Sequence, residues 1–132
     1  MKIVIDTNIL LSFFWKDSIT RKLIINLKNS LLAPEKAREE IIKYSNEIIQ
    51  KLKISRKDFE KLFEELEEYI DFIEKKEYSD FIEKVEKIAP DKDDCDFLAL
   101  AYKNEYTLWS NDKLLKNQEI VKIISTKELL ED

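Results

Sequence analysis

Four acidic residues stand where their carboxylates could act together. Asp6 follows a short apolar run, Asp112 follows a second run at 107–110, and Asp94 opens a segment with helical periodicity. Glu40 lies on the helix expected after the second strand. In an open parallel sheet, ligands bind in the crevice beyond the carboxyl ends of the strands, so side chains far apart in the sequence meet there. The sequence therefore predicts one cluster made of Asp6, Glu40, Asp94 and Asp112.

Such a cluster predicts a site for a divalent cation. Carboxylates held within a few ångströms of one another repel, and they do not all stay ionised without a counter-charge. Oxygen ligation without histidine or thiolate suits Mg²⁺ or Mn²⁺ rather than zinc. One or two such ions would lower the pKa of a bound water and clamp a phosphate, which is the chemistry of phosphodiester hydrolysis.

The composition excludes several other kinds of chemistry. The chain has no histidine, which removes Ser–His and Cys–His catalysis and most zinc and copper sites. It has no glycine, which Walker and dinucleotide-binding loops need where the backbone meets phosphate. Cys95 is the only cysteine, so neither an intramolecular disulfide nor a multi-cysteine zinc site can form. The chemistry must come from carboxylates, hydroxyls, amides, lysines or a hard metal ion.

Length and charge bound the class of protein. A chain of 132 residues that is 44% hydrophobic predicts a single domain with its own core. No apolar run is long enough to cross a membrane, so we expect a soluble, cytoplasmic protein. The net charge of −5 speaks against a nucleic-acid partner, but twelve of the 28 acidic residues lie in 58–88. The rest of the chain is close to neutral, which leaves room for a basic surface beside an acidic pocket.

Strands and helices are expected to alternate, which favours an α/β fold with a parallel sheet covered by helices on both faces. Residues 69–73 fit either a strand or the end of the preceding helix, and we favour the strand. The predicted strands are 2–5, 31–33, 69–73, 107–110 and 120–124. The predicted helices are 9–14, about 18–27, 35–52, about 56–68, 79–88, 94–104 and 127–131.

Four ordered segments resemble the motifs of PIN-domain ribonucleases, a family that includes the VapC-like toxins of toxin–antitoxin pairs. Each segment is weak by itself, but together they span nearly the whole chain in the family's order. The resemblance implies one PIN-like domain over 1–132 with a five-stranded parallel sheet. An acidic helical elaboration at about 46–88 would be a flap over the site, a dimer surface or an added helical layer. The segments are IDTNIL (5–10), EEIIKY (39–44), DCDFLALA (94–101) and WSNDK (109–113).

The resemblance also implies an activity and its residues. It implies that the chain is a Mg²⁺- or Mn²⁺-dependent endoribonuclease. Asn8 and Ser110 match polar positions of the family that orient ligands or water. An antitoxin protein and a second copy of the chain in a homodimer are further partners that fit it. The alternatives are DNA as the substrate, or an inactive binding module for a protein or RNA. The implied metal-binding and catalytic residues are Asp6, Glu40, Asp94 and Asp112.

Three of these four acidic residues also have an ordinary structural interpretation. Asp6 and Asp94 are good helix caps, and Glu40 has other glutamates beside it that are expected to be solvated. Asp96 falls about 200° round a helix from Asp94, so the two cannot face one site. Asp94 is preferred because it shares the apolar stripe of its helix and Asp96 does not.

Other candidate residues are weighed in the same way. Trp109, in a strand, is expected to belong to the core, whereas Trp15 fits a partner surface equally well. Cys95 is expected to be a small buried side chain, because no histidine could activate it. Four basic residues flank the acidic positions and could hold RNA phosphates, although solvation explains any one of them as well. They are Lys22, Arg38, Lys92 and Lys113.

Overall fold

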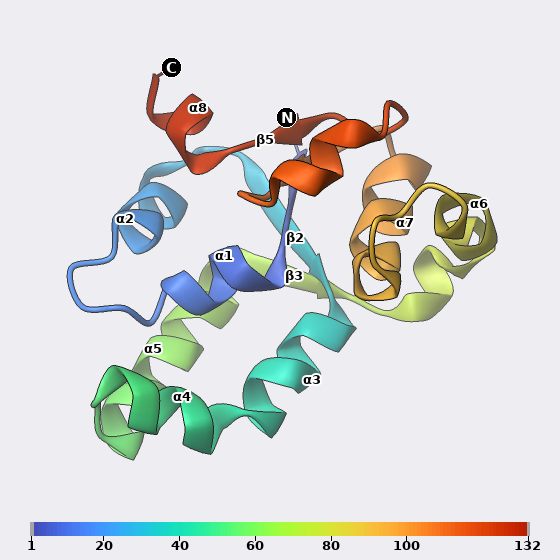
Figure 1. Cartoon of the computed structure of the whole chain (residues 1–132). Helices are drawn as coiled ribbons and strands as arrows, with labels where there is room; N and C mark the ends of the chain where they lie inside the picture. Colours follow the sequence, from blue (N-terminus) through green and yellow to red (C-terminus); the bar gives the residue numbers. More distant parts are fainter. Residues whose placement is uncertain (1, 132) are drawn as a thin grey trace.

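Five short apolar strands pair side by side into one parallel sheet (Figure 1). The computed structural model describes residues 2–131. The strands are β1 (Lys2–Ile5), β2 (Ser30–Pro34), β3 (Ile70–Ile73), β4 (Thr107–Trp109) and β5 (Ile123–Ile124). Their order in the sheet is β3-β2-β1-β4-β5. Ile3, Val4 and Ile5 of the central strand are fully buried, as expected for a parallel sheet covered on both faces.

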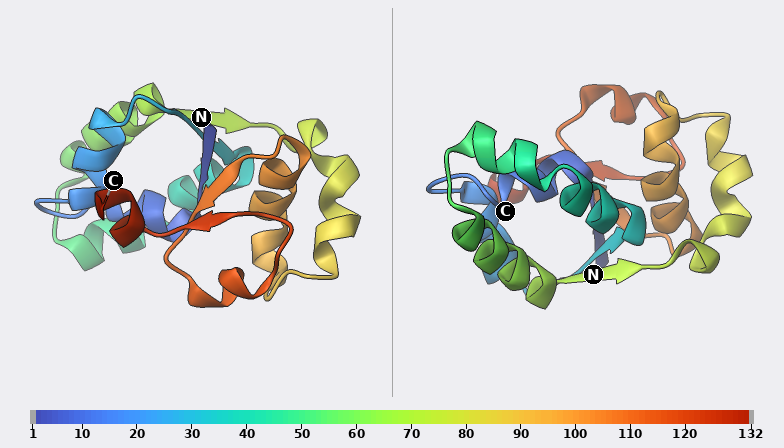
Figure 2. Two further views of the ribbon diagram at one scale, coloured as in Figure 1. Left: turned by 90° about the horizontal axis from the view of Figure 1, so that it is seen from above. Right: turned by 90° about the horizontal axis from the view of Figure 1, so that it is seen from below.

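Helices cover both faces of this sheet (Figure 2). The α-helices are α1 (Thr7–Ser12), α2 (Ile19–Asn26), α3 (Glu35–Lys43), α4 (Ser45–Leu52), α5 (Arg56–Tyr69), α6 (Ile82–Glu86), α7 (Cys95–Lys103) and α8 (Thr126–Glu131). Short 3-10 helices are η1 (Lys75–Glu77), η2 (Ser79–Phe81), η3 (Lys92–Asp94) and η4 (Lys113–Asn117). The chain moves outward from β1 to β3 and then crosses back to β4, so right-handed connections place α1–α5 on one face and α6 and α7 on the other. The predicted α/β class and five-stranded parallel sheet are confirmed.

Several element boundaries differ from the prediction for local reasons. The helix expected over 35–52 is two helices, because the backbone breaks at Tyr44 with φ −99° and ψ 16°. Ile42, in the last turn of α3, is 49% exposed. The last strand is only two residues long, because the Gln118 side chain holds the preceding segment in a turn through Leu115 and Val121.

Helix α7 ends without the glycine that usually stands there. Glu105 takes the left-handed conformation with φ 57°. The Tyr106 N–H donates to the Ala101 carbonyl at 2.9 Å, which satisfies the last turn of the helix. The same conformation at Lys53 (φ 56°) ends α4. A chain without glycine therefore accepts roughly 1 kcal/mol of strain at each such turn.

Helix α5 packs its apolar side chains into the core. Phe59, Phe63 and Leu66 of α5 are buried, and Phe14 stacks on Phe59 with ring centroids 5.0 Å apart. Cys95 is buried as expected. Within residues 2–131, no helix combines the length and apolar character needed to cross a bilayer.

The two tryptophans have different surroundings. Trp109 is fully buried, and its Nε1–H donates to Thr126 Oγ1 at 3.0 Å. The prediction that Trp109 belongs to the core is therefore confirmed. Trp15 is 54% exposed on the segment between α1 and α2.

Candidate metal centre

The candidate site lies where the sheet order reverses. Strand β1 has β2 on one side and β4 on the other, and Asp6 is the first residue after β1. The Asp6 N–H donates to the Trp109 carbonyl at 3.1 Å, so the carboxyl ends of β1 and β4 are joined at this point. Crevices at such switch points are the usual ligand sites of open α/β sheets.

Both carboxylate oxygens of Asp6 are oriented by hydrogen bonds. The Thr7 N–H donates to Oδ1 at 2.8 Å, and the Ser110 hydroxyl donates to Oδ2 at 2.7 Å. The Asp112 N–H in turn donates to Ser110 Oγ at 3.1 Å. Burial raises the pKa of Asp6, the bonds from Ser110 and Thr7 lower it, and the charge of Asp112 raises it. The Ser110 hydroxyl therefore joins the Asp6 carboxylate to the backbone of Asp112.

Asp94 completes a group of three carboxylates. It precedes the first residue of α7, yet its side chain makes no capping hydrogen bond with that helix. Burial, followed by the charges of Asp6 and Asp112, raises the pKa of Asp94 to about 6. Asp6 after β1, Asp94 at the end of η3 and Asp112 after β4 are thus near enough for their charges to interact, and helix capping does not account for Asp94.

Glu40 lies in a neighbouring group. Burial raises its pKa, Lys36 lowers it, and the charges of Asp93 and Asp96 raise it. The Lys36 ammonium is 3.9 Å from a carboxylate oxygen of each of these three acids. Glu40 therefore lies beside Lys36, whereas the charge of Asp94 interacts with those of Asp6 and Asp112, the two acids that Ser110 contacts.

The sequence did not single out Tyr78 or Lys36, and it led us to prefer Asp94 over Asp96. Asp96 was expected outside the apolar stripe of its helix but is buried, with a Tyr78 hydroxyl bond of 2.6 Å. No local signal reveals that bond, because the partners are 18 positions apart. The spacing of Lys36 and Glu40, one helical turn, did offer a signal for their ion pair.

The other residues proposed from the sequence are exposed or paired with residues outside the carboxylate group. Asn8 is exposed in the first turn of α1. Arg38, a candidate for binding phosphate, instead pairs with Glu67 at 2.9 Å and Glu35 at 3.4 Å. Lys22, Lys92 and Lys113 are exposed.

The donor set fits a hard divalent cation that keeps part of its water shell. Among the described residues, no three or more His, Cys, Asp or Glu side chains are already gathered closely enough to hold a metal ion. Mg²⁺ commonly contacts only one or two carboxylates and completes its shell with water and substrate oxygens. The mutual repulsion that raises the pKa of Asp94 is the kind that a cation relieves. Asp6, Asp94 and Asp112 are the carboxylates that could contribute ligands to Mg²⁺ or Mn²⁺ here.

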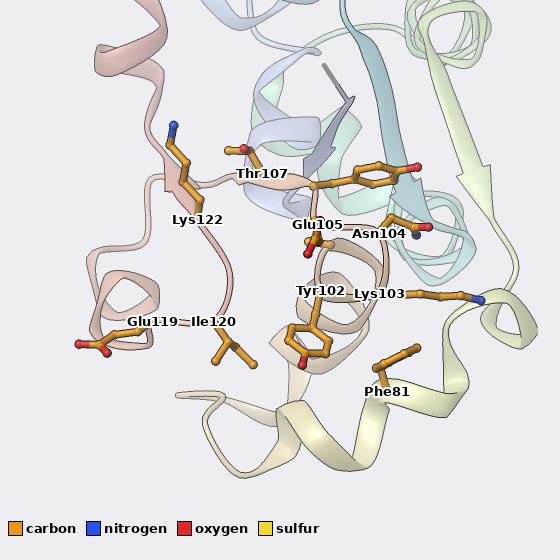
Figure 3. Close-up of a pocket in the computed structure, with 11 residues that line it drawn as sticks. Phe81, Tyr102, Lys103, Asn104, Glu105, Thr107, Glu119, Ile120 and Lys122 are labelled. Carbon is orange, nitrogen blue, oxygen red and sulfur yellow. The ribbon is translucent and has the colours of Figure 1, made fainter.

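A separate surface depression lies away from these carboxylates. It has a volume of about 760 Å³ and is lined in part by Phe81, Tyr102, Ile120 and Lys122 (Figure 3). It also reaches Thr107, the first residue of β4. The depression is thus at the amino end of β4, whereas the carboxylates follow the carboxyl ends of the strands.

Replacing Ser110 with alanine should weaken metal binding without unfolding the chain. The change removes the hydroxyl that donates to Asp6 and accepts from Asp112, and loss of such a supporting bond typically costs 10–100-fold in metal affinity or activity. Calorimetric titration with Mn²⁺ measures the effect. Ser79→Ala, a serine-to-alanine change in η2, serves as the control. An unchanged Mn²⁺ affinity in Ser110→Ala would contradict the role of the hydroxyl.

Comparison with known proteins agrees with the fold. The family model described as "PIN domain" matches residues 4–130. No curated protein matches the chain significantly. PIN domains are typically nucleases that act on RNA and use divalent metals. Since the match spans nearly the whole chain, the protein belongs to the PIN-domain family.

Proposed function

We propose that this chain is a metal-dependent endoribonuclease that hydrolyses RNA phosphodiester bonds at Asp6, Asp94 and Asp112. The observation that carries the proposal is the electrostatic coupling of these carboxylates at the reversal of the strand order. Membership of a family of nucleases supports it.

The residues of the chain have distinct parts in this proposal. When bound, Mg²⁺ or Mn²⁺ lowers the pKa of an attacking water and offsets the charge of the phosphate. Asp6 is held in a single orientation by Thr7 and Ser110. Asp94, with its pKa near 6, is ionised at pH 7.5 and able to bind a cation. Glu40, at the edge of the group, would complete the shell directly or through water.

The biological role and the protein partners are proposed from the resemblance of four ordered sequence motifs to those of VapC-like toxins. A cytoplasmic toxin of a toxin–antitoxin pair, with an antitoxin protein as its partner, is the role that the VapC-like resemblance favours. A homodimer fits the same resemblance. The alternative function is a catalytically inactive PIN fold that binds a protein or RNA through the same crevice.

Replacing Asp6 with asparagine should abolish RNA cleavage and preserve the fold. The substrate is a mixed pool of structured and single-stranded RNAs, incubated with Mn²⁺ or with EDTA. We expect cutting with Mn²⁺ only, and a loss of roughly a hundredfold or more in the variant, because a divalent ion contributes several kcal/mol of transition-state stabilisation. Circular dichroism checks the fold.

The control is Glu60→Gln, which removes one negative charge from the exposed face of α5. Cleavage by Asp6→Asn at the wild-type rate would refute the assignment. An intact protein whose melting temperature rises with Mn²⁺ but which cuts none of the RNAs would favour the binding module.

A further inference from the structure

A tryptophan side chain stands exposed just beyond the end of α1. Trp15 is 54% exposed, and Ile19, the first residue of α2, is 57% exposed. Trp15 belongs to residues 13–18, the α1–α2 turn, which follows the end of α1 that is farther from β1 (Figure 1). A single exposed apolar side chain is ordinary, so the surroundings of Trp15 decide its meaning.

The main chain of the α1–α2 turn is fixed from within. Arg21 Nη1 donates to the carbonyls of Phe13 at 2.6 Å and of Trp15 at 3.2 Å. The Ser18 hydroxyl donates to the Ser12 carbonyl at 2.6 Å and accepts the Arg21 N–H at 3.0 Å. Ser12 and Ser18 are both buried. The turn therefore presents the Trp15 indole to water on a rigid support, so that little order is lost when a ligand binds there.

The segment that carries this turn is basic, although the chain as a whole is acidic. Residues 7–34 contain four basic residues and one acidic residue, a net charge of +3. The remaining residues carry 19 basic and 27 acidic side chains, a net charge of −8. Lys16, Lys22 and Lys28 are exposed, and no carboxylate of residues 2–131 forms an ion pair with them. Their charges are free to meet an anionic partner.

Helix α1 connects the α1–α2 turn directly to the candidate metal centre. Asp6 accepts the Thr7 N–H at the start of α1, and the Trp15 N–H donates to the Ser12 carbonyl where the helix ends. The six residues of α1 span about 9 Å at the usual rise per residue. A short stretch of RNA with one phosphate at Asp6 can therefore reach the turn.

We propose that the α1–α2 turn binds single-stranded RNA, with the Trp15 indole stacked on a base and Lys16 and Lys22 contacting phosphates. An aromatic side chain beside positive charges is the usual composition of a single-strand site. The centres of protein–protein interfaces, in contrast, are depleted in lysine. Stacking needs an unpaired base whose face is open. The inference rests on the proposed function, in which RNA is the substrate, and it makes single-stranded RNA the preferred form.

The first test measures binding in EDTA, where metal-dependent cleavage cannot occur. The probe is a fluorescently labelled, unstructured RNA of about 12 nucleotides, followed by anisotropy. Trp15→Ala should weaken binding about tenfold, because stacking on one base is lost, whereas Trp15→Phe should keep most of the affinity. Tyr44→Ala, which removes a 44% exposed aromatic side chain elsewhere, is the control and should bind as the wild type does. The same RNA annealed to its complement should bind more weakly to the wild type.

Two further measurements separate stacking from a general loss of structure. The chain has two tryptophans, and Trp109 is fully buried, so quenching of tryptophan fluorescence by RNA should disappear in Trp15→Phe. Lys22→Gln should lower the salt dependence of binding by about 0.7 in the logarithmic slope, the value for one phosphate contact. Lys51→Gln, on the exposed surface of α4, should leave that slope unchanged. In cleavage assays Trp15→Ala should raise KM and leave kcat near the wild-type value.

Either of two results would overturn the role of Trp15. One is a wild-type protein that binds no single-stranded RNA. The other is equal RNA affinity in the wild type and in Trp15→Ala, which would leave the exposed side chains to a protein partner and leave the nuclease standing. RNA binding that depends on Trp15, in a protein that cuts no RNA, would refute the nuclease and support the stacking site.

Discussion

Replacing Asp94 with asparagine is expected to stabilise the metal-free protein at pH 7.5 while it removes metal binding and RNA cleavage. Burial and the charges of Asp6 and Asp112 raise the pKa of Asp94 from its ordinary 3.8 to about 6. Below pH 3.8 the carboxyl is protonated in both the folded and the unfolded chain. As the pH rises from there to about 6, the folded chain retains a proton that the unfolded chain has lost, so stability falls. Above pH 6 the whole cost is present.

Asparagine carries no charge, so the variant lacks this cost at pH 7.5. Solvent screening at a partly exposed carboxylate limits the gain to on the order of 1 kcal/mol. Cleavage should fall by roughly a hundredfold or more, because the ion that the carboxylate holds contributes several kcal/mol to catalysis. Stability and activity are thus expected to change in opposite directions.

Urea unfolding at pH 5 and pH 7.5, in EDTA and in saturating Mn²⁺, measures both effects. Saturating Mn²⁺ should stabilise the wild type by mass action and leave the variant unchanged. Glu60→Gln controls for the loss of one negative charge. A variant less stable than the wild type in EDTA at pH 7.5 would show that Asp94 is a structural cap. That result would contradict the repulsion inferred among the three carboxylates.

Replacing Trp109 with alanine is expected to lower the free energy of unfolding by about 3–5 kcal/mol. The indole is fully buried at the end of β4, and its Nε1–H joins the strand to α8 through Thr126. The Trp109 carbonyl also accepts the Asp6 N–H, so loosening β4 should displace the first carboxylate. For a domain of typical total stability, about 5–15 kcal/mol, this is a large fraction.

Urea unfolding compared with Trp15→Ala tests this expectation. Trp15 is 54% exposed, so its removal should cost about 0.5 kcal/mol or less, as is usual for surface changes. RNA binding by both folded variants provides a second measurement. Equal losses of stability would show that Trp109 is not a core anchor. Lost RNA binding with unchanged stability in Trp109→Ala would support base stacking instead.

The ends of the elements explain why three of the candidate site residues could be identified from the sequence. Asp6 and Asp112 follow strands, and Asp94 precedes a helix, so local patterns were enough to mark all three. Parallel strands present their carboxyl ends at one edge of the sheet, which makes convergence follow from the topology. Glu40 is different, because it lies within α3 and its surroundings depend on how that helix approaches α7.

Sequence alone determined the alternation of strands and helices, because this depends on local periodicity. It also excluded histidine-based catalysis and glycine-rich phosphate-binding loops and left oxygen atoms as the available metal donors, because these depend only on residue type. Only the tertiary structure decided that Ser110 binds Asp6 and that Tyr78 binds Asp96. It also placed Glu40 beside Lys36 and brought the charge of Asp94 close to those of Asp6 and Asp112. Those contacts join residues from different elements, and their distances are set by how the helices pack on the sheet.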